Sequence, residues 1–307
     1  MAHEHPHGHD DDHSRHGHGH QHGHGHVHGH DDPNFDWEAM ADSLEVDGAM
    51  ALPLVGAVVA DLVAGGLDPA AVGHVVDVGC GPGVVTCALA GHLPEAAVTA
   101  LDSAGQLLHR VRHRAAGHSL HERVATMEAD LEHDLPALAP ADLVWASMVV
   151  HHVAEPVVTL GRLLAALRPG GTLVMVEFAG SPSVLPDDDP LVAGGAWDRL
   201  EHAATASLLT RLGFDVIGHD WPAELTAAGF TGVTDRVVTF HHDAPLDGTG
   251  QRWLVRHVRR GIEMSGEALS AADGAVLEAF AAAVEAGERR DAFMRGERRV
   301  LTARRPG

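Results

Sequence analysis

The stretch Val75-Val76-Asp77-Val78-Gly79-Cys80-Gly81-Pro82-Gly83 decides the fold of this chain. Its apolar, β-branched start fits a parallel strand that is buried on both faces. Three glycines at alternate positions follow, and they allow a sharp turn and a close approach by a ligand where a Cβ atom would collide. Small and apolar residues at 84–90 then favour a helix. The stretch therefore predicts a strand, a glycine-rich turn and a helix.

The spacing of the glycines narrows the class of ligand. A dinucleotide-binding turn has the pattern G-x-G-x-x-G, and Val84 stands where its third glycine would be. A phosphate-binding P-loop is also excluded, because no Gly-Lys-Ser or Gly-Lys-Thr follows. Asp77 at the strand end suits a ligand with a cationic amine better than a pyrophosphate. The alternative is a tight turn that binds no ligand.

The composition bounds the size and the partners of the protein. The 307 residues, 45% of them hydrophobic, suffice for one large α/β domain or for two small ones. With 21 basic and 43 acidic residues, the formal net charge is −22, which disfavours binding to a nucleic-acid backbone. We therefore expect a small-molecule substrate that is neutral or cationic. We also expect a monomer or a homodimer.

Cysteine usage and hydropathy predict the compartment. Cys80 and Cys87 are too few for a disulfide framework, which fits a reducing cytosol. We find no apolar stretch of transmembrane length and no signal-peptide pattern at the N-terminus. These features predict a cytoplasmic protein that does not interact with a membrane.

Residues 1–34 form a low-complexity segment in which histidine alternates mainly with glycine. Such a segment has almost nothing to bury, so we expect a disordered tail. Neutral imidazoles bind Ni, Zn and Cu, which predicts either a metal-buffering or metal-sensing tail or a solvated tail that binds metal only incidentally. The candidate metal ligands are His16, His18, His20, His22, His24, His26, His28 and His30.

Helical patterns precede the glycine turn. Residues 35–70 contain two apolar sets at helical spacing, and Pro53 suits the start of the second helix. We expect both helices to cover a sheet. The first could instead close over a cofactor, with Trp37 or Met40 on the ligand side.

Acidic residues follow the next two predicted strands. The strand at 97–101 ends in Asp102, and an acidic group there can accept hydrogen bonds from both hydroxyls of a ribose. Alternatively, Asp102 caps the helix that starts near Ser103. After a third strand at 124–127, Asp130 could accept from an adenine amino group or be a solvated loop residue.

Residues 141–153 predict a buried fourth strand that ends beside the ligand crevice, where catalytic groups of open α/β sheets collect. His151 and His152 lie at this end. They are the candidates for a general base, should a poor nucleophile such as a hydroxyl need one. The alternative is that both histidines pack at a helix start.

The chain then continues the alternation of strands and helices. A helix at 160–167, a turn at 168–171 and a strand at 172–178 predict βαβ units and a parallel sheet. Two further segments, 180–228 and 245–292, are expected to be mainly helical and to shape the pocket for a substrate.

Two strands are expected within and after these segments, at 233–240 and 299–303. His241 and His242 follow the first of them and look like loop residues. Ser270 and Asp273 have the spacing of a capping box that opens a helix.

The order of these parts resembles that of class I S-adenosylmethionine (SAM) methyltransferases of the UbiE-like, small-molecule type. The parts that carry the resemblance are residues 75–83, Asp102, Asp130, the block at 142–152 and the turn Arg168-Pro169-Gly170-Gly171. The resemblance covers residues 35–307. It implies a Rossmann-like α/β fold with a seven-stranded, mostly parallel sheet and helices on both faces. The last strand would be inserted antiparallel between the fifth and the sixth.

The resemblance also implies SAM as the cofactor and names the residues that would bind it. The methionine part would lie near the glycine turn, the ribose at Asp102, the adenine between Asp130 and Leu131, and the methyl group near Ser147. The candidate cofactor-binding residues are Asp77, Gly79, Cys80, Gly81, Gly83, Asp102, Ser103, Asp130, Leu131 and Ser147.

The expected function is transfer of a methyl group to an O, N or C atom of a small molecule. The alternative, motivated by the histidine-rich tail, is a metal-handling protein whose SAM-binding fold is regulatory or non-catalytic. A metalloid methyltransferase would unite tail and fold, but that chemistry favours several thiols and the chain has two.

Overall fold

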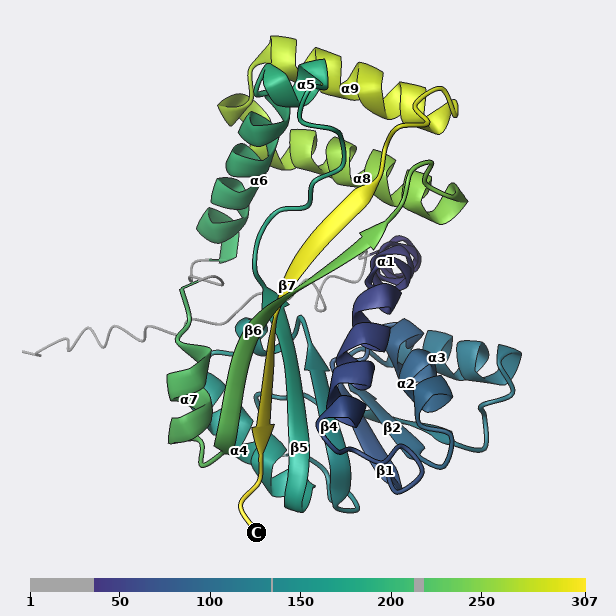
Figure 1. Cartoon of the computed structure of the whole chain (residues 1–307), viewed down its shortest axis with the longest axis vertical. Coiled ribbons are helices and arrows are strands. Elements are labelled where there is room, and N and C mark those ends of the chain that lie inside the picture. The colour runs from purple at the N-terminus through teal and green to yellow at the C-terminus, as the bar shows by residue number, and fades with distance from the viewer. Residues whose placement is uncertain (1–35, 134, 213–217) are drawn as a thin grey trace, which may run out of the picture. The chain divides into compact units, whose positions relative to one another are not determined.

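The computed structural model of the protein describes residues 36–133, 135–212 and 218–307 (Figure 1). These residues contain a seven-stranded sheet with the strand order β3-β2-β1-β4-β5-β7-β6. The strands are β1 (His74–Val78), β2 (Ala97–Asp102), β3 (Val124–Glu128), β4 (Ala141–Ser147), β5 (Leu167–Phe178), β6 (Thr231–His242) and β7 (Met294–Arg304).

Strand direction confirms the predicted fold class. β1 to β5 pair parallel to one another, whereas β7 pairs antiparallel with β5 on one side and with β6 on the other. The last strand is thus inserted between the fifth and the sixth, as the resemblance implied. Parallel strands place their carboxyl ends at one edge of the sheet, and a ligand crevice forms at that edge.

Helices cover both faces of the sheet. They are α1 (Trp37–Ala64), α2 (Val84–His92), α3 (Gly105–Gly117), α4 (Pro156–Ala166), α5 (Pro190–Ala193), α6 (Ala196–Leu212), α7 (Trp221–Ala227), α8 (Gly248–Ser265) and α9 (Ala271–Glu285). Neighbouring residues of β1 confirm the two faces. Val75 belongs to a hydrophobic cluster that includes Val58 of α1, and Val76 belongs to a second cluster that includes Leu160 of α4. Alternate side chains of a strand point to opposite faces, so β1 is buried on both.

One long helix replaces the two that were predicted before the glycine turn. α1 runs without interruption through Pro53, which was expected to start a second helix. Proline lacks the amide that would bond to the carbonyl of Ala49, so it weakens the helix at this point. Met50 and Leu54, on either side of Pro53, are both buried. Tertiary packing of this face therefore keeps the helix continuous.

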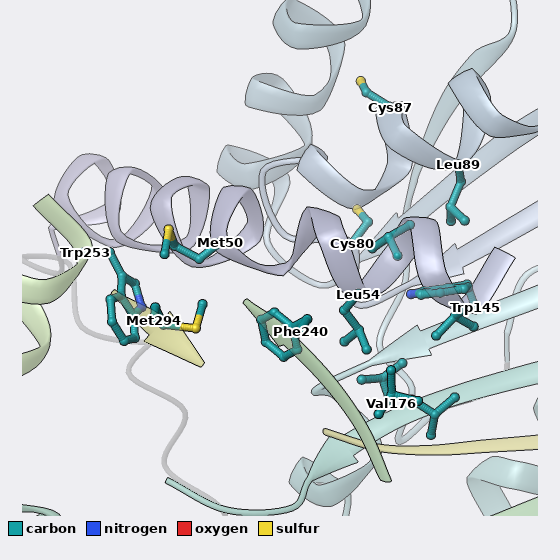
Figure 2. Close-up of a cluster of buried hydrophobic side chains, with 14 of the residues drawn as sticks. Met50, Leu54, Cys80, Cys87, Leu89, Trp145, Val176, Phe240, Trp253 and Met294 are labelled. Atoms are coloured by element: carbon teal, nitrogen blue, oxygen red, sulfur yellow. The ribbon is translucent and has the colours of Figure 1, made fainter. Parts of the chain in front are cut away.

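The hydropathy of α1 also corrects an expectation. By length and composition it is apolar enough to cross a membrane, although no such stretch was expected. Here α1 packs against α2, α3, α8 and β6. Figure 2 shows Met50 and Leu54 of α1 within a cluster of buried side chains that includes Trp145, Phe240 and Trp253.

The helical segments on the substrate side form a layer beyond the carboxyl ends of the strands. α6 packs against α8, α8 packs against α9, and α8 also contacts α1 (Figure 1). Ser270 caps α9 by accepting a hydrogen bond at 3.1 Å from the amide of Asp273, which confirms the predicted cap. His241 and His242 are the last residues of β6 rather than loop residues, because the antiparallel pairing with β7 extends to both.

Candidate active site

The glycine turn between β1 and α2 has the predicted conformation. Gly79, Gly81 and Gly83 have φ values of 64°, 53° and 79°, in the left-handed region that favours glycine. A Cβ atom on Gly79 would lie 2.4 Å from Cγ2 of Val149, so this glycine is required by packing. A Cβ atom on Gly81 would meet only Cδ1 of Leu44, at 3.9 Å. Gly81 is thus the glycine beside which a ligand has room.

Asp102 at the end of β2 holds the glycine turn in place. Its Oδ2 accepts a hydrogen bond from the amide of Gly81 at 2.8 Å, and its Oδ1 accepts one from the amide of Ala104 at 3.0 Å. The bond to Ala104 does not cap α3, because that helix begins at Gly105 with Ala104 as its N-cap residue and has no side-chain capping bond. Each carboxylate oxygen can accept two hydrogen bonds, so these two contacts are compatible with a binding role. The structure therefore brings together the two strand ends that sequence reasoning singled out.

Asp77 lies inside the fold rather than at the surface of the crevice. Its side chain is 2% exposed, and its Oδ2 accepts a hydrogen bond from the hydroxyl of Thr86 at 2.6 Å. Burial raises the pKa of Asp77 to about 7, with Thr86 lowering it and Asp102 raising it. Binding of a cationic amine by Asp77 stays a prediction.

The thiol of Cys80 also packs inside the turn. The Cys80 side chain is buried, and burial raises its pKa well above the ordinary value of a thiol. A low thiolate fraction makes Cys80 a poor nucleophile or metal ligand. Both Cys80 and Cys87 are free thiols.

The remaining candidate cofactor residues lie at the ends of β2, β3 and β4. Ser103 and Asp130 are exposed, and Asp130 accepts hydrogen bonds from the amide of Glu132 and from Nδ1 of His133, each at 2.9 Å. Leu131 is buried. Ser147 is the last residue of β4. Their contacts with a cofactor stay predictions.

The fourth strand is shorter than predicted. It ends at Ser147, and Met148 follows with a φ of 55°, in the left-handed region that a branched or long side chain rarely adopts. A short 3₁₀ helix, Val150–His152, then turns the chain. The amide of Met148 still bonds to the carbonyl of Val176 at 2.8 Å, which keeps this strained residue beside β5.

The turn places His151 against a carboxylate that sequence reasoning missed. The Nδ1 atom of His151 lies 2.5 Å from Oε2 of Glu177, the penultimate residue of β5. His151 is 3% exposed and Glu177 is fully buried. An ionised carboxylate can only accept, so an ionised Glu177 favours the His151 tautomer in which Nδ1 donates and Nε2 can accept a proton. Oε1 of Glu177 is buried and has no hydrogen-bond partner among the described residues.

His152 lies beside His151 but is exposed. The two rings are 4.1 Å apart, and the ring of His151 also lies 5.0 Å from that of Phe178. Of the two predicted base candidates, His151 is therefore the buried one, and it is paired with a buried carboxylate.

A group of cations gathers near this point, and none of them was a sequence candidate. The charges of Arg256, Arg260, His257 and Arg298 all act on the carboxyl of Asp47 in α1. Burial nevertheless raises the pKa of Asp47 above its ordinary value, and the four cations oppose this shift. Three of the cations come from α8 and the fourth from β7, which explains why sequence spacing could not reveal them.

The histidines proposed to bind metal lie outside the described residues. Within residues 36–133, 135–212 and 218–307, no group of three or more His, Cys, Asp or Glu side chains is arranged to hold a metal ion.

Comparison with known proteins gives three findings. Residues 75–171 match the model of a family described as a methyltransferase domain. A trans-aconitate 2-methyltransferase of Azoarcus sp. (strain BH72) is 41% identical over 109 residues, which cover 36% of this chain and 40% of the relative. A solved structure of Haemonchus contortus phosphoethanolamine N-methyltransferase 2 with S-adenosyl-L-methionine is 15% identical, covering 79% of this chain and 50% of the other, with a TM-score of 0.46.

The extent of these matches differs. The chain spans about two fifths of the length of the first relatives that it matches. A longer match is to a trans-aconitate 2-methyltransferase of Methylobacterium nodulans, 33% identical over 198 residues, which cover 62% of this chain and 68% of the relative. With this match and the inserted antiparallel strand β7, the chain belongs to the class I SAM-dependent methyltransferases.

Proposed function

We propose that the protein transfers a methyl group from SAM to an O, N or C atom of a small-molecule acceptor. The observation that carries this proposal is the tie between Asp102 and the amide of Gly81. It joins the acidic end of β2 to the one glycine of the turn beside which a ligand has room. The space beside Gly81 would be narrowed by a Cβ atom, and it lies next to the acidic Asp102. Such a space fits a ligand that contains a ribose and an adjoining amino acid.

Each candidate residue has a proposed part in holding the cofactor. Asp102, which fixes the turn by accepting from two amides, accepts from the ribose hydroxyls. Leu131 offers an apolar surface and Asp130 an acceptor for the adenine. The backbone at Gly81 approaches the methionine part, and Ser147 lies on the side of the methyl group.

Bound SAM supplies a methyl group that is already activated, so the protein's task is placement and proton removal. We propose that His151 takes the proton of the acceptor through Nε2 and that Glu177 holds the ring. The charge of the buried Glu177 carboxylate stabilises the imidazolium that results. His152, the other candidate, is exposed and lies beside this pair.

The proposal is tested by binding and by transfer. Calorimetry of the full chain with S-adenosylhomocysteine should show binding, and Asp102→Ala should weaken it at least tenfold, because charge-assisted hydrogen bonds to the ribose are lost. Asp68→Ala is the matched control, since Asp68 is exposed and also accepts from the amide two residues on. Methyl transfer from isotopically labelled SAM to a panel of small molecules that includes trans-aconitate measures the activity. If the wild-type chain binds no S-adenosylhomocysteine, the proposal is wrong.

Two further expectations extend this proposal. We propose that the protein acts in the cytoplasm, supported by the free thiols of Cys80 and Cys87. We also propose that the tail histidines, His16 to His30, bind Ni, Zn or Cu, which titration of the full chain with each metal tests. The metal-handling alternative draws no support from the described residues.

A further inference from the structure

We infer that Arg298 is the anchor for a carboxylate group of the methyl acceptor and that Arg260 assists it from α8. This inference rests on the proposed function, because it names the class of molecule that the active site receives. It reverses the expectation of a neutral or cationic substrate that the overall charge of −22 suggested.

Arg298 lies on β7 at the end of β5. In the sheet it is paired with Phe178, and its guanidinium lies over the rings of Phe178 and Phe240, 5.9 Å from each centroid. It donates one hydrogen bond, from Nη1 to the carbonyl of Glu297 at 2.8 Å. Within the described part of the chain, no carboxylate lies within ion-pair distance of this guanidinium, although a guanidinium has five donors to satisfy.

Burial makes this position costly for a cation. The pKa of Arg298 is lowered by burial, and the carboxylates of Asp47 and Glu177 act against that shift from a distance. The side chain nevertheless keeps part of its surface accessible. A guanidinium that is surrounded by protein, still reachable and without an ion-pair partner is suited to receive an anion.

The surrounding charges favour a carboxylate over a phosphate. Arg256 is already paired with Asp47, and it also donates to the carbonyl of Ser43. Arg260 and Arg298 have no such partner within the described ranges. Arg260 and Arg298 are therefore the arginines of this group that are left to receive an anion. The carboxylates of Asp47 and Glu177 act on Arg298, so they would repel the doubly charged group of a phosphate more strongly than the single charge of one carboxylate group.

The anchor and the proposed base are neighbours. Phe178 is in contact with both, since its ring lies 5.0 Å from the ring of His151 and 5.9 Å from the guanidinium of Arg298. A molecule that places its carboxylate on Arg298 can therefore extend across Phe178 and present a second group to His151. Anchoring through a remote charge would orient that group for methyl transfer.

The test is binding of carboxylates to the full chain by calorimetry, with S-adenosylhomocysteine present at saturation. The probes are fumarate, citrate, phenylacetate and trans-aconitate, each compared with its methyl ester, and phosphoethanolamine as the phosphate probe. We expect at least one carboxylate to bind and its ester to bind at least tenfold more weakly. Arg298→Met should lower the affinity for that carboxylate at least tenfold. Arg298→Lys should lower the affinity less than Arg298→Met does, and Arg260→Met should cause a smaller loss of affinity than Arg298→Met.

Arg252→Met is the matched control, because it removes the same charge from α8. Arg252 and Arg260 both line a hollow of about 610 Å³ along this helix. We expect Arg252→Met to change the affinity less than twofold, and all variants to bind S-adenosylhomocysteine as the wild type does, which shows that they are folded.

Three results would overturn the inference. The first is equal affinity for every carboxylate and its ester, and the second is binding of phosphoethanolamine alone. The third is an equal loss of affinity in Arg252→Met and Arg298→Met, which would place the anion in the hollow along α8. Failure of the proposed function is a different result, because S-adenosylhomocysteine binding is measured separately and the carboxylate titration can be repeated without it.

Discussion

The two sides of the active site are built in different ways. On the proposed cofactor side, the ends of β1 and β2 carry a glycine turn and Asp102. A single hydrogen bond ties Asp102 to Gly81, which lies 21 residues before it. The proposed acceptor side draws its residues from five separate elements, α1, the turn after β4, β5, α8 and β7, which supply Asp47, His151, Glu177, Arg260 and Arg298 in that order. The first side is local in sequence, and the second exists only in the folded chain.

This difference shows that the net charge of a chain does not predict the charge of its binding site. The whole chain is strongly acidic, yet the acceptor side gathers arginines around one paired carboxylate. Net charge describes solubility and long-range attraction, whereas a binding site is governed by groups within a few ångströms, where the effective dielectric constant is low.

The largest expected effect is on catalysis and tests the proposed acceptor side. His151→Ala should lower kcat by about 10²- to 10⁴-fold, because it removes the group proposed to take the proton. Glu177→Gln should also lower kcat and change its pH profile, because an amide can donate to Nδ1 and stabilise the tautomer that has no basic Nε2. Stopped assays with labelled SAM across pH 6 to 9 measure both.

His152→Ala is the control for the His151 and Glu177 variants, because His152 lies next to His151 but is exposed. This variant should reduce kcat only a few-fold. S-adenosylhomocysteine affinity should stay unchanged in all three variants. If His152→Ala is as inactive as His151→Ala, the assignment of the base to the buried histidine is wrong.

The next effect sharpens the cofactor side by comparing two glycines of one turn. Gly79→Ala should lower the free energy of unfolding by about 3 kcal/mol or more, because its Cβ atom would lie 2.4 Å from Val149 and the backbone is left-handed. Gly81→Ala should lower it by only about 1–2 kcal/mol, since left-handed strain is its main cost. Urea unfolding measures both.

The affinity for S-adenosylhomocysteine should show the opposite order. Gly81→Ala narrows the room beside the turn, so it should weaken S-adenosylhomocysteine binding more than Gly79→Ala does. Equal unfolding energies for the two variants would contradict the division of the glycines into a packing residue and a ligand-side residue.

The last prediction concerns Asp77 and the pH dependence of stability. Its pKa of about 7 in the folded state exceeds the ordinary value of 3.8, so the folded state binds a proton more tightly than the unfolded state. Stability should therefore fall as pH rises from about 4 to about 7, by on the order of 4 kcal/mol, and level off above that range. Urea unfolding of the wild type and of Asp77→Asn at several pH values isolates this contribution as the difference between them. A constant difference over that range would show that Asp77 titrates normally.

Several parts of the fold were predictable because their signals are local. Alternating strand and helix patterns predicted the parallel sheet, and the glycine spacing with Asp102 predicted which strand ends would meet. The predictions that failed concern where a helix or a strand is interrupted. α1 passes through Pro53 because both flanking turns bury their apolar side chains, and β4 ends at Ser147 because Met148 takes a left-handed conformation. Neither cause is visible in residue spacing.

By itself, the sequence determined the alternation of strands and helices along the chain, the glycine turn and the acidic residue beside it, because backbone sterics and hydrophobic periodicity act over a few residues. Tertiary structure alone decided that Glu177 meets His151 and that Arg298 lies uncompensated beside Phe178. The first pair depends on the parallel pairing of β4 with β5, and the second depends on the antiparallel insertion of β7 beside β5. Their energies come from burial and charge, and those arise only when distant segments exclude water together.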